Sequence, residues 1–518
     1  MKYLLPLIII AVFLSLFKLG TATLFDVDEA VFSEATKEMV ESGDWITPTY
    51  NGKNRYDKPI LHYWFMALSY EIFGINEFGA RFPSAIASLL LALTIFLFVR
   101  RFRDEKTAFY AALSCVLSIY FVVYSHAAVT DMTLTLFITL SLFSFYRSSI
   151  GNTVPDKKTN IYLYAFYAFS ALAFLTKGLI GILFPFGIAM IYIDITEGWR
   201  GIKRIVSIKG ILLFLIIAAP WYIGQTAING QEFINAFFVK HHFKRYFGVI
   251  SSHTGPLYYY LPVLLLGLFP WVLFLPSGIR NTLKGKDNLN VFSLVWLAAI
   301  FVFFSLSSTK LPNYILPAIP AASILISAGM FEPGKRWFRY SNLFMTVASL
   351  VTGAAFILSV KYLTQAGAHN VDWTILPALA MLGIMIAGLY AFFTKKTPYA
   401  VLSILMIAFL TILLTKALPL ANQFLQGTLY KYSLYAKYRL QKDEQLFECG
   451  TNNPSIVFYS DRKIIPIRGK DDLLSITKKY KDKEALAITK TDDMDMLRNS
   501  CFSLLEKDAH FAIFEKNR

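Results

Sequence analysis

The sequence predicts an all-α polytopic membrane protein with about 13 transmembrane helices, interfacial helices in the first outer loop and a small C-terminal soluble α/β domain. Three observations favour this fold class. The 518-residue chain is 56% hydrophobic and 16% charged, whereas soluble domains carry about 25% charged residues. Apolar runs of spanning length recur as far as residue 418. The Lys and Arg residues concentrate in the short loops between these runs.

Thirteen apolar segments are long enough to cross a bilayer as helices. They are residues 3–20, 82–99, 107–124, 132–146, 161–176, 179–195, 210–226, 257–277, 291–308, 313–330, 342–362, 374–393 and 399–418. The first segment is alternatively a cleaved signal peptide, but its length and the lack of an A-x-A cleavage motif favour a retained span. We expect a transmembrane domain over residues 1–424.

The loops between these segments alternate in basicity. The basic loops contain Arg100-Arg101-Phe102-Arg103, Lys157-Lys158, Lys203-Arg204, Lys284-Gly285-Lys286, Lys335-Arg336 and Lys395-Lys396. Because basic loops stay in the cytoplasm, the N-terminus is expected inside and the C-terminus outside. We therefore expect a multi-pass protein of the cell (inner) membrane, with its active site on the periplasmic or outer face. The net charge of +16 reflects these loops, so no nucleic-acid partner is expected.

Residues 21–81 form an outer segment that contains two candidate amphipathic helices. Asp26 and Glu29 have the spacing of a capping box, and the helix that follows is expected to stop at Gly43. A second helix is expected over residues 57–74, beginning at the Asp. Aromatic side chains opposite a polar face are typical of helices that lie in the membrane interface.

The composition changes to mixed charge after the last span, which predicts a soluble α/β domain over residues 425–518. Strand-like runs at 456–459, 485–488 and 511–514 flank a predicted helix at 470–481. Cys449 and Cys501 either form a disulfide in an oxidising compartment or stay separate thiols. The sequence leaves these two alternatives open.

Charged residues of the first outer segment are the leading candidates for chemistry. Asp28 and Glu29 stand beside the bilayer, where ionisable groups are expensive and usually functional. The alternative is that they only complement a helix N-terminus. Lys58 is expected in the first turn of its helix, where free N–H groups already favour an anion, so it is a candidate phosphate ligand. The alternative is a lysine that extends from the interface into water.

Other outer corners carry an acid, cations and a tyrosine that suit a lipid phosphate and a group being transferred. These residues are Asp131, Lys177, Arg245, Lys310 and Tyr314. Each has a structural alternative, such as a helix N-cap for Asp131 or a solvent-exposed lysine for Lys177. The adjacent His241 and His242 suggest a metal site that includes Asp57, although two adjacent histidines are poor bidentate ligands.

Most of the membrane part carries motifs in a fixed order. They are Asp28-Glu29-Ala30, Ser42-Gly43-Asp44-Trp45, Tyr56-Asp57-Lys58-Pro59-Ile60, Phe73-Gly74, Gly79-Ala80-Arg81, Thr130-Asp131, Thr176-Lys177-Gly178, His242-Phe243-Lys244-Arg245-Tyr246, Tyr258-Tyr259-Tyr260-Leu261-Pro262 and the run from Ser308 to Pro317. In these motifs the chain resembles the membrane glycosyltransferases of the GT-C class. It is most similar to the lipid A aminoarabinose transferase branch, which is related to the protein O-mannosyltransferases.

The resemblance implies a sugar donor carried on a polyprenyl (undecaprenyl-type) phosphate, transfer on the outer face and inversion at the anomeric carbon. It implies a role at the reaction centre for Asp28 and Asp131, and a role on the lipid phosphate for Lys58, Arg245 and Tyr314. The candidate catalytic residues are Asp28, Glu29 and Asp131, and the candidate lipid-phosphate ligands are Lys58, Arg245, Lys310 and Tyr314.

One position departs from the family pattern. In the aminoarabinose enzymes the residue before the lysine is usually Glu, which pairs with a loop histidine on a metal. Here that residue is Asp57, which is shorter, and the histidine is His242. A divalent metal ion therefore stays an alternative, and no cofactor is firmly required.

The acceptor stays open among a glycolipid such as lipid A, a polysaccharide and a protein hydroxyl. A protein O-glycosyltransferase is thus the first alternative. A lipid or solute transporter is the second, but transporters place polar groups near the midplane and often carry internal repeats. This chain places its charges in outer loops and shows no repeat. A polymer ligase would carry a large outer loop late in the membrane part, which is not seen.

Overall fold

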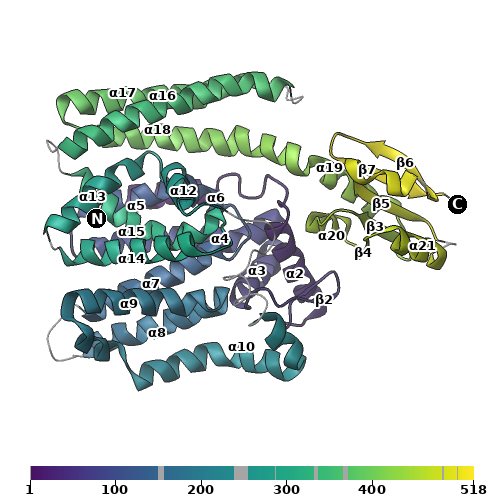
Figure 1. Ribbon diagram of the computed structural model, residues 1–518, viewed down its shortest axis with the longest axis horizontal. Coiled ribbons are helices and arrows are strands. Elements are labelled where there is room, and N and C mark those ends of the chain that lie inside the picture. Colours follow the sequence, from purple (N-terminus) through teal and green to yellow (C-terminus); the bar gives the residue numbers. More distant parts are fainter. Residues whose placement is uncertain are drawn as a thin grey trace. The chain divides into compact units, whose positions relative to one another are not determined.

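The computed structural model describes residues 2–149, 157–237, 255–285, 287–331, 336–365, 371–480, 483–498 and 500–517. The chain forms two compact units. The first comprises Met1–Leu19, Tyr56–His62 and Arg81–Lys416, and the second comprises Gly20–Arg55, Tyr63–Ala80 and Ala417–Arg518. Figure 1 shows long helices in the first unit and a sheet with helices in the second. The expected division into residues 1–424 and 425–518 stays a prediction, because compactness does not define which residues leave the membrane.

The first unit is built almost entirely from apolar helices (Figure 1). They are α1 (Leu4–Leu16), α4 (Glu77–Val99), α5 (Glu105–Val116), α6 (Ile119–Ser125), α7 (Asp131–Ser149), α8 (Lys157–Lys177), α9 (Ile180–Glu197), α10 (Ile208–Ile234), α12 (Tyr260–Gly267), α13 (Leu275–Gly285), α14 (Asn288–Leu306), α15 (Ile319–Met330), α16 (Arg336–Gln365), α17 (Ile375–Thr394) and α18 (Tyr399–Ile412). Short 3-10 turns include η3 (Trp271–Phe274) and η4 (Pro312–Ala318). The prediction of a mostly helical polytopic membrane protein is confirmed.

Within the described residues, eight helices are long and apolar enough to cross a membrane, or up to ten if each of two bent pairs is one span. α5 and α6 meet at an angle of 59°. α5 ends at Val116, and the Ser118 hydroxyl accepts from the Phe121 N–H as the N-cap of α6. α12 and the segment that ends in α13 meet at 112° around Pro270, which has no N–H to continue a helix. The predicted spans 107–124 and 257–277 are therefore broken helices.

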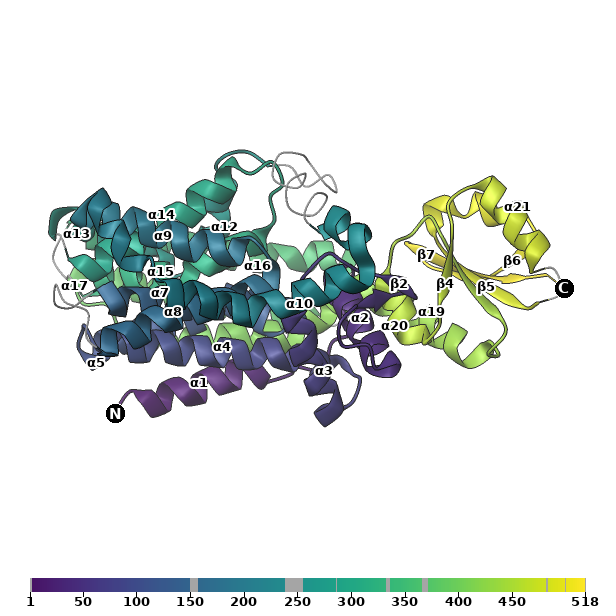
Figure 2. The same cartoon turned by 90° about the horizontal axis from the view of Figure 1, so that it is seen from below.

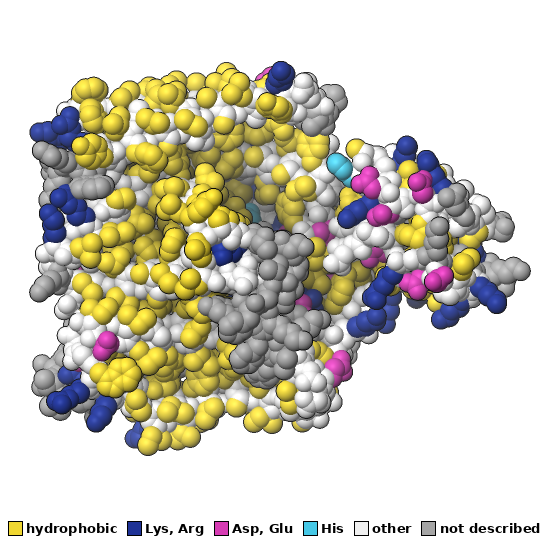
Figure 3. All heavy atoms as spheres, in the orientation of Figure 1, with side chains coloured by type: hydrophobic (Ala, Val, Ile, Leu, Met, Phe, Trp, Pro, Cys, Tyr) yellow, Lys and Arg dark blue, Asp and Glu magenta, His cyan; other side chains and the backbone are white. Residues whose placement is uncertain are grey.

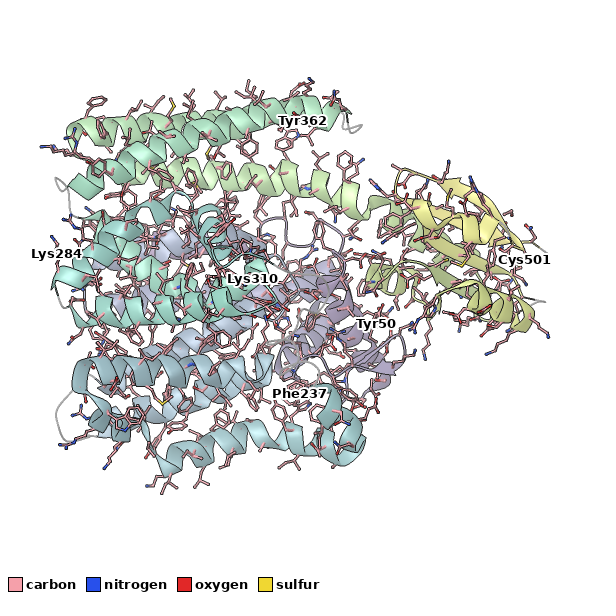
Figure 4. All side chains as sticks on the ribbon, viewed as in Figure 1. Tyr50, Phe237, Lys284, Lys310, Tyr362 and Cys501 are labelled. Carbon is pink, nitrogen blue, oxygen red and sulfur yellow. The ribbon has the colours of Figure 1, made fainter. Side chains whose placement is uncertain are left out.

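The surface of the first unit separates apolar from basic side chains. Hydrophobic side chains cover the sides of the helices in Figure 3, and Lys and Arg side chains gather at the left end. Lys284 lies at that end, and Lys310 lies toward the opposite end (Figure 4). Exposed Arg100, Lys203 and Lys284 come from the loops that the sequence marks as basic. One basic end and apolar sides are the pattern expected of a membrane-spanning unit.

The first helix of the outer segment, α2 (Asp28–Ser42), ends where expected. Gly43 has a left-handed φ of 72°, and its N–H bonds to the Met39 carbonyl at 3.0 Å. The predicted capping box is wrong. The Glu29 carboxylate accepts from the Phe25 N–H at 2.9 Å, and Asp26 accepts from the first turn of a different helix. The spacing matched a local motif, but a more distant partner holds the Asp26 carboxylate.

The second helix of the outer segment, α3 (Leu61–Phe73), begins later than expected. Residues 57–60 are irregular, so Lys58 precedes the helix and does not lie in its first turn. Pro59 explains the shift, because a proline disfavours helical geometry for the residue before it. The helix ends before Gly74, whose φ of 81° is left-handed, in agreement with the prediction.

A five-stranded sheet forms the centre of the C-terminal part of the second unit. Its strands are β3 (Gln445–Cys449), β4 (Ile464–Ile467), β5 (Ala485–Lys490), β6 (Phe502–Lys507) and β7 (Phe511–Lys516), in the order β4-β3-β5-β7-β6. β3 is parallel to β4 and β5, and β7 is antiparallel to β5 and β6. β5, β7 and α21 (Lys470–Lys479) agree with three predicted elements.

The predicted strand at 456–459 is wrong, because these residues lie in α20 (Pro454–Ser460). Ile456, Val457, Phe458 and Tyr459 are all buried. A short continuous apolar run fits a buried strand and a buried helix equally well, and here Pro454 starts a helix.

Helices cover both faces of this sheet (Figure 2). α19 (Leu418–Arg439) and α20 pack with Leu446 of β3 on one face, and α21 and α22 (Asp495–Arg498) pack with Phe447 and Cys449 on the other. Successive residues of a strand point to opposite faces, so β3 contributes to both apolar clusters. Cys449 and Cys501 are free thiols, which answers the open question of a disulfide between them.

A charge cluster that is buried on its α2 side joins α2 to Asp461, the residue after α20. Glu34 and Lys37 are 4% and 6% exposed, and Lys37 Nζ lies 2.5 Å from Asp461 and 3.7 Å from Glu34. Burial raises the pKa of Glu34 to about 7, although the charge of Lys37 opposes the change. Ionisation of the Glu34 carboxyl is therefore the least favourable ionisation in this cluster at neutral pH.

We expect Glu34→Gln to stabilise the second unit at pH 8 and to change little at pH 4.5. Folding raises the pKa of Glu34 from 4.5 to about 7, so its contribution to stability is lost as the pH rises through about 7. The shift corresponds to roughly 3 kcal/mol at alkaline pH. Thermal unfolding in detergent across this pH range measures the effect, with exposed Glu41→Gln as the control. A difference from wild type that does not vary with pH contradicts this expectation.

Candidate active site

Side chains from three separate segments meet at the start of α7. Asp131, the first residue of α7, is 4% exposed. Its Oδ1 accepts from Lys177 Nζ at 2.7 Å and from Asn313 Nδ2 at 3.0 Å. Lys177 Nζ also lies 5.7 Å from the centre of the Tyr314 ring, within the range of a cation–π contact. We call Asp131, Lys177, Asn313 and Tyr314 the Asp131 cluster.

Two helix ends explain why these charges are stable there. Asp131 lies at the N-terminus of α7, where the helix dipole is positive, and Lys177 is the last residue of α8, where it is negative. The chain leaves α8 at Gly178, which has a φ of 74° and bonds to the Phe174 carbonyl at 2.8 Å. α7 and α8 pack against each other, so the two opposite charges face one another.

The η4 turn, which carries Asn313 and Tyr314, is held by donors from three helices. The bonds are Tyr120 Oη to the Pro312 carbonyl (2.9 Å), Tyr260 Oη to the Leu311 carbonyl (3.2 Å) and Trp296 Nε1 to the Pro317 carbonyl (2.9 Å). Prolines lack N–H groups, so this turn cannot satisfy itself as a regular α-helix. The external donors fix the turn and thereby the two side chains that it adds to the Asp131 cluster.

Lys310 is placed by the end of α14. It is 5% exposed, and its Nζ donates to the carbonyls of Ser305 at 3.0 Å and Ser307 at 2.6 Å. A lysine at a helix C-terminus satisfies free carbonyls and complements the dipole. The predicted role of Lys310 on a lipid phosphate is not visible in these contacts and stays a prediction.

The short stretch Tyr56–His62 of the first unit contributes a lysine and a histidine. Lys58 is half-buried, and its Nζ donates to the Asp57 carbonyl at 3.1 Å. His62 is fully buried, with Nδ1 3.1 Å from the Thr133 hydroxyl of α7. Burial lowers the pKa of His62 to about 4, although the charge of Asp131 opposes the change. His62 is therefore neutral at pH 7 and does not compete with Lys177 for the Asp131 carboxylate.

The two predicted acids of the first outer segment belong to the second unit and differ in their surroundings. Asp28 is the exposed first residue of α2. Glu29 is 5% exposed, and its carboxylate closes the turn before α2 by its bond from the Phe25 N–H. The Asp28 side chain is thus accessible, and the catalytic assignments of Asp28 and Glu29 both stay predictions.

The predicted metal ligands do not form a visible set. Arg245 and His242 lie outside the described residues, and Asp57 is half-buried. In the described ranges, no three His, Cys, Asp or Glu side chains gather in a way that could hold a metal ion. The metal hypothesis for Asp57 and His242 stays open, and we assign no chemical step to a metal.

The predicted site omits Asn313 and leaves Lys177 open, although both are partners of Asp131. Both lie in the motifs noted above, next to Tyr314 and Thr176. Asn313 lies 182 positions from Asp131, and Lys177 lies 46 positions from it, so no local sequence pattern predicts these pairs. The cluster offers an ammonium, an amide and a phenol in fixed positions, which are donors suited to a phosphate or to sugar hydroxyls.

We expect Lys177→Met to destabilise the first unit by about 3–5 kcal/mol, because it leaves the buried Asp131 carboxylate without its ammonium partner. The double change Asp131→Asn/Lys177→Met removes both charges and should recover much of this loss. Arg204→Ala breaks the more exposed Arg204–Glu197 pair of the same unit and should cost about 0–1 kcal/mol. Thermal unfolding of the purified proteins in detergent compares the three. If Lys177→Met and Arg204→Ala lower stability equally, the buried pair contributes no more to stability than the exposed pair.

Comparisons with known proteins identify the family of this chain. Residues 57–223 match the dolichyl-phosphate-mannose-protein mannosyltransferase family. The chain is 33% identical over 336 residues to the undecaprenyl phosphate-α-4-amino-4-deoxy-L-arabinose arabinosyl transferase of Shewanella sediminis, an alignment that covers 62% of this chain and 58% of that one. It is 30% identical over 379 residues to the corresponding transferase 1 of Pseudomonas fluorescens, covering 72% of this chain and 67% of that one.

A solved structure agrees over nearly the whole chain. ArnT from Cupriavidus metallidurans, crystallised with undecaprenyl phosphate, matches with a TM-score of 0.85 at 23% identity and covers 99% of this chain and 98% of that one. At this identity the match concerns the fold. Together with the sequence relatives, it shows that this chain belongs to the GT-C family of polyprenyl-phosphate-sugar-dependent glycosyltransferases that contains the aminoarabinose transferases.

Proposed function

We propose that this enzyme moves a sugar from an undecaprenyl-type phosphate to a lipid A-like glycolipid on the outer face of the inner membrane. The Asp131 cluster is the observation that carries the proposal, since it sets a fixed cation and hydrogen-bond donors at one end of an ArnT-like helical unit. The donors named for the Shewanella and Pseudomonas relatives support an undecaprenyl phosphate-linked sugar. A protein hydroxyl is the alternative acceptor, and the match to the mannosyltransferase family supports it.

The chemistry of the donor assigns a role to each charge. When the glycosidic bond breaks, negative charge develops on the lipid phosphate that leaves. Fixed cations and donors stabilise this charge more in the transition state than in the ground state. We assign the lipid phosphate to Lys58, Arg245, Lys310 and Tyr314, and we add Lys177 and Asn313 as the groups that hold Asp131.

The acids act on the sugar and the acceptor. We assign the acceptor proton to Asp28, which as a carboxylate can accept it from a hydroxyl as the new bond forms. An acceptor phosphate is already ionised, and Asp28 would then position or stabilise the sugar. Direct displacement forms one new bond and inverts the anomeric carbon. Asp131 and Glu29 complete the proposed catalytic set, and Asp57 and His242 are the proposed ligands of a metal, if one binds.

The helices support a proposed membrane topology. The eight single candidates and the two bent pairs, together with α1, α7 and α8, are compatible with the proposed 13 spans. With an odd number of spans and one basic end, we propose that the N-terminus is in the cytoplasm and the C-terminus is outside. The proposed outer face is then the end of the first unit that carries Lys310.

Reporter fusions at residue 440 and in the loop after α9 are expected to report opposite sides of the membrane. The positive-inside rule puts the basic loop in the cytoplasm and the C-terminal residues outside. Alkaline phosphatase and green fluorescent protein fusions give complementary signals and serve as controls for each other. If both positions report the cytoplasm, the proposed outer active site is excluded.

Asp28→Asn and Lys58→Ala are expected to impair transfer in different ways. Lys58→Ala removes a cation from the phosphate site, so it should weaken donor binding and lower kcat/KM by about one to two decades. Asp28→Asn keeps the shape and removes the charge, so it should preserve donor binding and lower kcat by at least about a hundredfold. The assay is transfer from a polyprenyl-phosphate sugar in detergent, with donor binding measured separately. Near-wild-type transfer by both folded variants would mean that this segment is not the active site.

Mass spectrometry of lipid A and of envelope proteins, with and without the gene, distinguishes the acceptors. Loss of a sugar from lipid A upholds the glycolipid proposal, and loss from peptides alone favours the protein O-glycosyltransferase.

A further inference from the structure

The residues just before Asp28 are held by the C-terminal part of the second unit. Segment 23–26 makes hydrogen bonds with both α19 and α20. These helices lie about 400 residues later in the chain, and the Asp26–Asn453 pair spans 427 positions. No helix or strand contains this segment. Its conformation therefore depends on these side-chain bonds.

Asp26 makes the most extensive of these contacts. Its carboxylate accepts from the Ser455 N–H at 2.8 Å, from the Ser455 hydroxyl at 2.5 Å and from Asn453 Nδ2 at 3.0 Å. With its amide oriented to satisfy both groups, Gln426 Nε2 donates to the same carboxylate at 3.1 Å, and its Oε1 accepts from the Asp26 N–H at 3.0 Å. Burial raises the pKa of Asp26, and these donors oppose the change.

Thr23 and Leu24 have partners on the same two helices. Asn422 of α19 makes two hydrogen bonds with the Thr23 backbone. Its Oδ1 accepts from the Thr23 N–H at 3.1 Å, and its Nδ2 donates to the Thr23 carbonyl at 3.0 Å. The Leu24 N–H donates to the Tyr459 hydroxyl of α20 at 2.7 Å, and this hydroxyl donates to Glu77 at 2.8 Å. The segment is thus bonded to α19 at Thr23 and to α20 at Leu24.

The bonds end where α2 begins. Glu29 closes the turn by accepting from the Phe25 N–H, and Asp28 is exposed between these two anchors. Asp26 and Asp28 are separated by a single residue, so any shift of the Asp26 backbone moves the Asp28 carboxylate. A displacement of about 1 Å in a reacting group can lower the rate by about a hundredfold.

We propose that Asp26, held by Asn453 and Ser455 at the start of α20, is a positioning residue for Asp28, and that the C-terminal α/β part serves to set the catalytic segment. The inference rests on the proposed function of Asp28. Asp26 does not touch the substrate in this scheme. Its carboxylate acts through the backbone that carries Asp28, and Gln426 assists it from α19.

A structural role alone would predict lower stability without a specific effect on turnover. The variants Asp26→Asn and Ser455→Ala test the difference, because the first keeps the size of the side chain and the second removes one donor. Asp508→Asn is the matched control. Asp508 also joins α19 to the sheet, through the Thr428 hydroxyl, and accepts from the His510 and Phe511 N–H groups at 2.7 Å. The partners Thr428, His510 and Phe511 all lie outside segment 23–29.

The experiment uses the full-length enzyme in detergent, an undecaprenyl-phosphate-linked sugar as donor and undecaprenyl phosphate as the binding probe. We expect Asp26→Asn to lower kcat about tenfold to a hundredfold and to leave KM for the donor and the binding of undecaprenyl phosphate near wild type. Ser455→Ala should lower kcat less, in the same direction. Asp508→Asn should lower the unfolding temperature and leave kcat within about twofold of wild type.

The double variant Asp26→Asn/Asp28→Asn separates positioning from other effects. If Asp26 acts through Asp28, the double variant has the same residual kcat as Asp28→Asn alone. Independent, multiplicative losses overturn the inference, as does a wild-type kcat for folded Asp26→Asn or an equal loss in Asp508→Asn. Where Asp28→Asn leaves no measurable transfer, the comparison of Asp26→Asn with Asp508→Asn decides. Wild-type activity of Asp28→Asn instead refutes the proposed function, whatever Asp26→Asn does.

Discussion

Charges in apolar surroundings need partners, and this constraint organises the helical unit. Lipid provides no hydrogen bonds, so ionisable groups gather at helix ends and pair there. Asp131 at the start of α7 and Lys177 at the end of α8 form such a pair, and Lys310 is bonded to the carbonyls at the end of α14. The direction of each helix decides whether its end favours an acid or a base. The positions of these acids and bases therefore follow from the direction in which each helix crosses the membrane.

The same pairing gives the site its chemical character. Lys177 is held by Asp131 on one side and lies over the Tyr314 ring on the other, so its ammonium is oriented before any substrate arrives. In the proposed scheme this pair keeps Asp131 fixed, while the cations assigned to the lipid phosphate stabilise it as it leaves without a cost of reorganisation. His62 stays neutral because it is buried, and it connects the segment with Lys58 to α7. These features suit a reaction whose leaving group is a lipid phosphate.

The second unit follows the same rule with backbone N–H groups and hydroxyls as partners. Asp26 accepts from the Ser455 N–H, and Asp461 accepts from Lys37, so these two bonds join α2 and the segment before it to α20 and the residue that follows it. Glu29 accepts from the Phe25 N–H and closes the turn before α2. The sheet behind α19 and α20 provides the rigid support, because apolar clusters fill both of its faces. A C-terminal part without a recognisable motif of its own thus acquires a physical connection to the segment that carries Asp28.

Properties that depend on local chemistry were predictable from the chain. Bilayer thickness sets the length of apolar runs, so the helical membrane fold was evident, and left-handed glycines correctly placed the ends of α2 and α3 at Gly43 and Gly74. Asp131 and the lysines stood out because charge is costly beside lipid.

Pairing between distant segments depended on the packing of the folded chain. The run at 456–459 became a helix because it is buried among α19, α2 and the sheet, and Asp26 bonded to α20 although a local capping box was available. Asn313 reached Asp131 across 182 residues. Such partners leave no periodic signal, since the free energy that selects them arises only when the chain brings them together and removes them from water.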